Sequence, residues 1–267
     1  MNLRPVAGIV LRQMYLMRTS PARILPMFAW VAIDIVLWGF LTRYLNTVTA
    51  ARVDFVPLLL GAILMWDFFQ RIMHGVTTAF FEDLWARNFL SLFATPLTRA
   101  EYVTGLVITS MLTSVIGLVV MLVLATAVFG LSFFAWGALL VPFLLLLFLF
   151  GVTFGILGCA LVLRMGPASE WLIWPIPALL SPFVGVLYPM SVLPGWMQAI
   201  GWLMPPSYVF EGMRAAVNGG AFDGRGLAIG SVLAVVQVLL SGWVFAGVYR
   251  HAVRTGLLAR YSAESVS

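Results

Sequence analysis

Four ionisable residues stand in otherwise apolar stretches of the sequence, at spacings that could support an ion pair. Asp67 and Arg71 are four residues apart with the acid first, which is the better order for a pair on one helix face. His74 follows one turn later, and Asp34 stands in an earlier apolar stretch. A carboxylate in the middle of a bilayer costs at least about 2.5–3.5 kcal/mol unless it is compensated. We therefore expect an Asp67–Arg71 pair that faces the protein interior, with Asp34 close enough to share it.

Two functions fit this intramembrane polar cluster, which consists of Asp34, Asp67, Arg71 and His74. The side chains could line a polar path for a substrate, or hold a closed state together as a latch. Alternatively, the acid and the base could satisfy each other and only fix the rotation of their helix, since pairing alone accounts for charges at this depth. The sequence leaves both interpretations open.

A second acid–base pair, Glu211 and Arg214, stands three residues apart in a proline-rich apolar segment. At a solvated surface such a pair contributes less than about 1 kcal/mol. At the outer leaflet of a membrane the same pair could act as a gate latch. Both are hypotheses that the sequence does not separate.

The residue inventory argues against an intramembrane enzyme, the third function class that the sequence could represent. His74 and His251 are the only histidines and Cys159 is the only cysteine, so no zinc-protease motif, internal disulfide or multi-cysteine metal site can form. No Gly-x-Ser-x-Gly elbow occurs. All fifteen basic residues are arginine, whereas a phosphate-binding P-loop requires lysine. We expect no catalytic residue, no metal site and no cofactor in the chain itself.

The composition predicts an all-α polytopic membrane protein. Of 267 residues, 62% are hydrophobic and 9% are charged, whereas soluble domains contain about 25% charged residues. A helix needs about 20 apolar residues to cross a bilayer. Six stretches meet this requirement: Ile24–Leu45, Phe55–Phe81, Tyr102–Phe129, Trp136–Leu163, Trp171–Tyr188 and Leu227–Tyr249. Gly151, Gly155 and Gly158 in the fourth stretch predict close helix packing.

The arginines set the predicted orientation. With both termini in the cytoplasm, ten arginines lie on the cytoplasmic side and four outside, the asymmetry that the positive-inside rule describes. Residues 1–20 interleave apolar residues with Arg4, Arg12 and Arg18, which predicts a helix lying in the membrane interface. A frayed basic tail is the alternative. The arginine bias also fits a GC-rich bacterial genome, so we expect the bacterial cytoplasmic (inner) membrane as the location.

Prolines mark a second unusual region, since half of the chain's fourteen lie in residues 175–206. Pro175, Pro177 and Pro182 should break or bend the fifth span. Residues 189–217 then predict an outer re-entrant hairpin with two short helices, Gly195–Leu203 and Ser207–Val217. Irregular backbone at membrane depth is tolerated only where protein or water surrounds it. The hairpin is therefore expected to be a plug or gate between spans five and six.

Two segments resemble the permease subunits of ABC type 2 exporters. The first, FEDLWARNFLSLFATPLTRAEYVTG, covers Phe81–Gly105 and resembles the family's cytoplasmic coupling helix. Its matching positions are Glu82, Asp83, Thr95, Pro96, Arg99, Glu101 and Gly105. The second, residues 188–214, resembles the family's outer hairpin. Its matching positions are Tyr188, Pro189, Leu193, Pro194, Pro205, Pro206 and Arg214, while Met204 stands where the family often has asparagine.

The predicted coupling helix, residues 82–100, is amphipathic. Its apolar stripe is formed by Trp85, Phe89 and Leu92. Asp83 and Arg87 point away from that stripe. Such a helix could dock into a groove of a partner protein or rest on the bilayer surface. The resemblance favours docking to an ATPase.

The resemblance implies that residues 1–267 form a single transmembrane domain, the permease subunit of an ATP-driven exporter that is not catalytic alone. It implies an ABC ATPase partner in two copies, which binds ATP and Mg, and a second copy of the chain. The apolar composition favours a hydrophobic, lipid or lipid-linked substrate. A secondary, ion-coupled transporter is the alternative, although such proteins commonly show matched broken helices in both halves. Nucleic-acid binding is not expected, because the arginines are scattered.

Overall fold

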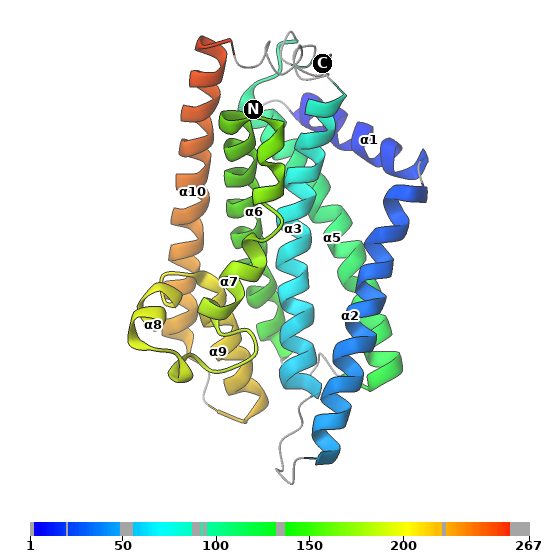
Figure 1. The fold of residues 1–267 in the computed structure, drawn as a ribbon, viewed down its shortest axis with the longest axis vertical. Coiled ribbons are helices and arrows are strands. Elements are labelled where there is room, and N and C mark those ends of the chain that lie inside the picture. The colour runs from blue at the N-terminus through cyan, green and yellow to red at the C-terminus, as the bar shows by residue number, and fades with distance from the viewer. Residues whose placement is uncertain are drawn as a thin grey trace.

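The computed structural model describes residues 3–19, 21–48, 56–86, 92, 95–131, 137–220 and 223–256. Helices account for the regular structure in these ranges, and no strand occurs in them. The long helices of the described residues run along the length of the molecule (Figure 1). These are α2 (Pro21–Val48), α3 (Gly61–Trp85), α5 (Arg99–Phe129), α6 (Leu140–Met165) and α10 (Gly224–Arg254), with a π-helical turn, Val56–Leu60, leading into α3.

Shorter helices occupy the two ends of this bundle. Helix α1 (Leu3–Thr19) lies across one end, called here the α1 end (Figure 1). Helices α7 (Ile176–Val184), α8 (Gly195–Gly201) and α9 (Pro205–Val217) gather toward the opposite end, called here the hairpin end. The predicted N-terminal helix is therefore present, and its location at a membrane surface stays a prediction.

Three helices in the described part of the chain are long and apolar enough to cross a membrane. They are Arg99–Phe129, Gly137–Met165 and Gly224–Arg254. Each matches a predicted span to within a few residues. This finding supports a multi-pass helical membrane protein, and the predicted count of six spans stays a prediction.

The segment predicted as the fifth span is broken, as its prolines predict. A 3-10 helix (Pro167–Leu172) comes first, and α7 follows with only nine residues. At 1.5 Å per residue, α7 is about 14 Å long, less than half of the ~30 Å hydrocarbon layer. Pro175 precedes α7, Pro182 lies inside it, and Gly185 ends it in a left-handed conformation with φ of 65°. Trp171–Tyr188 is therefore not one continuous helix.

The core of the bundle is the contact between α3 and α6. A Cβ added at Gly151 would lie 2.7 Å from Ile72, and one at Gly155 would lie 2.8 Å from Val76. Only glycine allows the two helices to approach this closely, so the predicted packing role is confirmed. Phe69 of α3 and Phe150 of α6 fill the space beside this contact, with ring centroids 5.0 Å apart.

Candidate functional site

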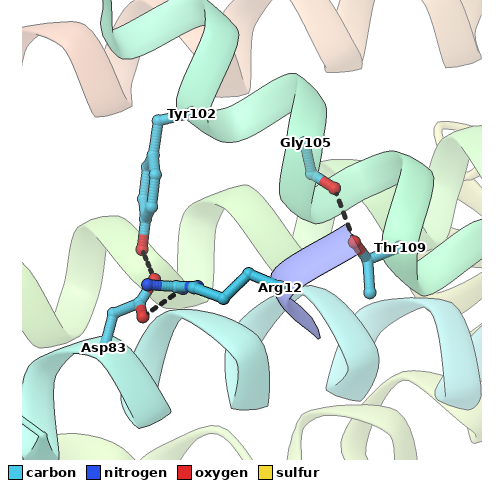
Figure 2. Close-up of polar contacts among 5 residues, drawn as sticks. All are labelled: Arg12, Asp83, Tyr102, Gly105 and Thr109. Carbon is cyan, nitrogen blue, oxygen red and sulfur yellow. Dashed lines mark hydrogen bonds and ion pairs between the residues drawn. The ribbon is translucent and has the colours of Figure 1, made fainter. Parts of the chain in front are cut away.

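Three helices meet at one buried carboxylate at the α1 end. Asp83, near the last turn of α3, accepts a hydrogen bond from the Tyr102 hydroxyl of α5 at 2.8 Å. Arg12 of α1 forms an ion pair with the other carboxylate oxygen. Figure 2 shows both contacts converging on Asp83. The side chain of Asp83 is 3% exposed and that of Arg12 is 30% exposed. We call Arg12, Asp83 and Tyr102 the α1 junction.

Close packing supports this junction on the α5 side. A Cβ added at Gly105 would lie 2.8 Å from the side chain of Ile9. The Ile9 side chain of α1 therefore packs directly against the backbone of α5. Thr109, one turn further, donates its hydroxyl hydrogen to the Gly105 carbonyl at 2.8 Å (Figure 2). Gln13 is 1% exposed. With its amide turned so that both atoms are satisfied, it donates to Glu82 at 3.2 Å. Helix α1 is thus fixed to α3 at two successive residues.

The structure divides the predicted coupling segment into internal and exposed residues. Asp83 and Glu101 are buried, and Glu101 forms a capping box with Thr98 at the start of α5. Trp85 is 55% exposed. Leu92 is packed against the core, and Thr95 and Pro96 form an exposed turn. Arg87 and Phe89 lie outside the described residues. The burial of Asp83 and Glu101 removes them as direct contacts for a partner.

The predicted ion pair between Asp67 and Arg71 is present, and its depth in a membrane stays a prediction. Arg71 donates from Nε to Asp67 at 2.7 Å, and the two side chains are 10% and 15% exposed. Asp34 of α2 lies close enough to both to interact electrostatically. A Cβ added at Gly117 of α5 would lie 3.2 Å from the Arg71 guanidinium. The pair therefore stands where α2, α3 and α5 meet.

His74 does not extend the pair in the way its spacing predicts. Its ring lies against Trp174 in the break before α7, with centroids 4.6 Å apart. Its Nε2 atom is buried and has no hydrogen-bond partner among the described residues. His74 thus connects α3 to the broken segment between α6 and α7.

Glu211 ties the hairpin together at the opposite end. Its Oε1 accepts a hydrogen bond from the backbone N–H of Met190 at 2.7 Å. The same oxygen accepts from Arg214 at 3.0 Å. The side chains of Arg214 and Glu211 are 11% and 33% exposed, so the pair is partly buried rather than fully solvated. Glu211 instead joins α9 to the turn between α7 and α8.

The other predicted hairpin residues shape its turns. The Tyr188 hydroxyl donates to the Pro182 carbonyl at 2.9 Å, and Pro189 follows in an extended conformation. Leu193 is buried, and Pro194 precedes the first turn of α8. Pro205 and Pro206 open α9. The two short helices, α8 and α9, are therefore present at nearly the predicted positions, and their depth in a membrane stays a prediction.

Replacing Glu211 by alanine should destabilise the hairpin by about 2 kcal/mol, because a charged hydrogen-bond acceptor with two donors is lost. Glu211→Gln should cost less, since a side-chain oxygen is kept for the Met190 N–H. Asn218→Ala, at the exposed end of α9, is the matched control. Thermal unfolding of the purified protein in detergent measures all three. Equal melting temperatures for the three variants would contradict a tie through Glu211.

Sequence reasoning missed several residues of these sites. Tyr102, Met190 and Trp174 each meet a predicted residue from another helix or turn. Gln237 of α10 donates to the Leu203 carbonyl at 2.8 Å and so anchors the hairpin to the bundle. A polar residue in the apolar sequence of α10 is the one signal that could have indicated such a contact.

These features define a helical, multi-pass membrane protein with organised polar contacts at both ends and a buried ion pair between them. The family model described as ABC-2 type transporter matches residues 10–218, which run from α1 to the end of α9. The chain therefore belongs to the ABC-2 type transporter family. Members are membrane subunits of transporters that are not catalytic by themselves and generally work with an ABC ATPase subunit. No curated protein matches the chain.

Proposed function

We propose that this permease is the membrane-spanning subunit of an ATP-driven exporter. It moves a hydrophobic, lipid or lipid-linked substrate outward from the cytoplasmic side, in the bacterial inner membrane. A separate ATPase, in two copies, binds ATP and Mg and docks at the α1 end. A second copy of the chain completes the path. Family membership supports a permease role. The absence of lysine from the sequence supports ATP hydrolysis by a separate subunit.

The α1 junction is the observation that carries this proposal. Asp83 lies at the point where α3 ends and the predicted coupling segment begins, and it holds α1 and α5 through Arg12 and Tyr102. Because its partners come from two other helices, a force on this segment acts on three helices together. The exposed Trp85, two residues further, offers a large apolar side chain to a partner.

One rigid element links that junction to the hairpin. Helix α3 runs without interruption from Gly61 to Trp85. Trp66 packs against Phe210 of α9, with ring centroids 6.0 Å apart. Asp83 lies 17 residues further along the same helix, about 25 Å at 1.5 Å per residue. A displacement of α3 at the α1 end therefore reaches the gate formed by α8 and α9.

ATP hydrolysis by the purified components tests this function. The permease alone should not hydrolyse ATP, and adding its ATPase should give hydrolysis that a substrate stimulates. Trp85→Ala should weaken ATPase binding by about tenfold, as expected for an aromatic hot spot. Trp171→Ala, a similarly exposed tryptophan on the 3-10 helix before α7, is the control. Hydrolysis by the lone chain, or substrate flux driven by an ion gradient without ATP, would contradict the proposal.

A further inference from the structure

Two arginines from distant parts of the chain converge on one backbone carbonyl at the α1 end. Arg99, the first residue of α5, donates from Nη1 to the Ala246 carbonyl of α10 at 3.4 Å. Arg250 donates from Nε to the same oxygen at 3.2 Å. The Arg99 guanidinium also lies over the Tyr249 ring, 5.2 Å from its centroid. A single oxygen therefore holds two positive groups side by side.

Neither guanidinium has a carboxylate partner in the described part of the chain. The acid nearest to Arg99 in sequence is Glu101, whose carboxylate bonds to Thr98 in the capping box. Two adjacent cations repel each other unless an anion lies between them. The planar guanidinium presents its remaining donors as a fork, which matches the oxygens of a phosphate. The arrangement suits one phosphate group bound by both arginines.

The surroundings indicate that this phosphate belongs to a lipid. Exposed apolar residues form one stripe along α10, namely Val232, Val236, Leu239 and Trp243. Arg250 continues the stripe, seven residues after Trp243. A Cβ at Gly247, next to Ala246, would meet nothing within 4 Å among the described residues. The surface beside the two guanidinium groups is therefore open on the same side of α10 as this apolar stripe.

The depth of the pair also fits a headgroup. Helices α5 and α10 are both candidate membrane spans. Ala246 lies eight residues before the end of α10 at Arg254, about 12 Å along the helix. Tryptophan and tyrosine collect at this level in membrane proteins, where hydrocarbon gives way to headgroups. Trp243 and Tyr249 flank the carbonyl in this manner.

We propose that Arg99 and Arg250 bind the phosphate of an anionic membrane lipid in the leaflet at the α1 end. The lipid would join α5 to α10 through a shared phosphate, with Trp243 against its acyl chains. This role does not depend on the transport function proposed above, and it gives Arg99 a task other than ATPase docking. Phosphatidylglycerol is a suitable probe because its headgroup carries a net negative charge, whereas the choline group of phosphatidylcholine neutralises its phosphate.

Lipid binding to the purified full-length permease, without its ATPase, tests the proposal. Native mass spectrometry in neutral detergent can compare phosphatidylglycerol with phosphatidylcholine. Arg99→Gln and Arg250→Gln should each lower the affinity for phosphatidylglycerol by about tenfold, the equivalent of one charge-assisted hydrogen bond. Arg250→Lys, which keeps the charge and loses the fork, should fall between Arg250→Gln and the unmodified protein. Unchanged phosphatidylcholine binding shows that a variant is folded.

Arg254→Gln is the matched control, because Arg254 is exposed four residues further along α10. We expect it to change phosphatidylglycerol affinity by less than about twofold, as for a general surface charge. Equal losses for all three glutamine variants would overturn the proposal. Displacement of phosphatidylglycerol by inorganic phosphate at the same concentration would overturn the lipid assignment. Unchanged lipid binding by the glutamine variants, together with weakened ATPase binding in a separate assay, would assign the two arginines to a protein contact instead.

Discussion

Arg71→Gln should prevent the permease from assembling, whereas the double variant Asp67→Asn/Arg71→Gln should assemble. Removing one partner of a buried ion pair costs about 3–5 kcal/mol, because it leaves a charge without compensation. Both side chains are at most 15% exposed. Replacing both partners removes both charges and leaves two neutral polar groups that can bond to each other. The monodisperse fraction after extraction in mild detergent, and its melting temperature, measure the effect.

Because Asp34 lies near the ion pair, the single variants Arg71→Gln and Asp67→Asn should differ in stability. Arg71 is the cation for Asp67 and also interacts with Asp34. Arg71→Gln therefore leaves two carboxylates near each other, whereas Asp67→Asn leaves Arg71 with Asp34 as an alternative partner. We expect Arg71→Gln to be the more harmful of the two. Equal stability of both single variants would contradict a shared cluster.

The double variant also separates the two roles that the sequence leaves open. If it assembles and transports, the ion pair fixes helix rotation and does not line the substrate path. If it assembles without transporting, the charges themselves are required for passage of the substrate. Transport into inverted vesicles is the readout, with assembly checked on the same preparation.

Asp83→Ala should have the second large effect, because it removes the centre of the α1 junction. Arg12 loses its ion pair and the buried Tyr102 hydroxyl loses its acceptor. We expect a loss of about 3 kcal/mol in the free energy of unfolding. Tyr102→Phe should cost about 1–2 kcal/mol, since only one hydrogen bond is removed and the ring remains in place.

A coupling role predicts more than lost stability. The variant Arg12→Met/Asp83→Leu/Tyr102→Phe replaces all three polar groups of the α1 junction by apolar ones, which can restore stability, but it leaves no charged tie between α1 and α3. Its ATPase activity with the partner should persist while transport per ATP hydrolysed falls. Arg18→Gln, at the exposed end of α1, is the control. Full transport by the apolar variant would show that the junction only stabilises the fold.

Local patterns predicted those parts of the structure that depend on one segment. Asp67 and Arg71 share a helix face, so their spacing alone determines the pair. Pro175 stands at the break before α7, because a proline removes a backbone donor from its own helix. The hairpin helices follow from the same local chemistry.

Contacts between distant segments could not be predicted in this way. Arg12 and Asp83 are 71 residues apart. Helical periodicity placed Asp83 on the polar face of its helix, but it could not indicate that this face packs against α1. Tyr102 at the start of an apolar run is equally typical of an interfacial aromatic residue. His74 has the spacing of the ion pair, yet packing against Trp174 determines its position.

The central claim is that a force received at the α1 end opens a hairpin on the other side of the membrane. Single cysteines can replace the exposed Trp85 or Asn218 in a protein whose buried Cys159 is changed to alanine. They report on which side of the membrane the α1 end and the hairpin end lie. A membrane-impermeant maleimide should label position 218 in intact cells and position 85 only after the membrane is opened. Labelling of both positions from the same side would contradict the account.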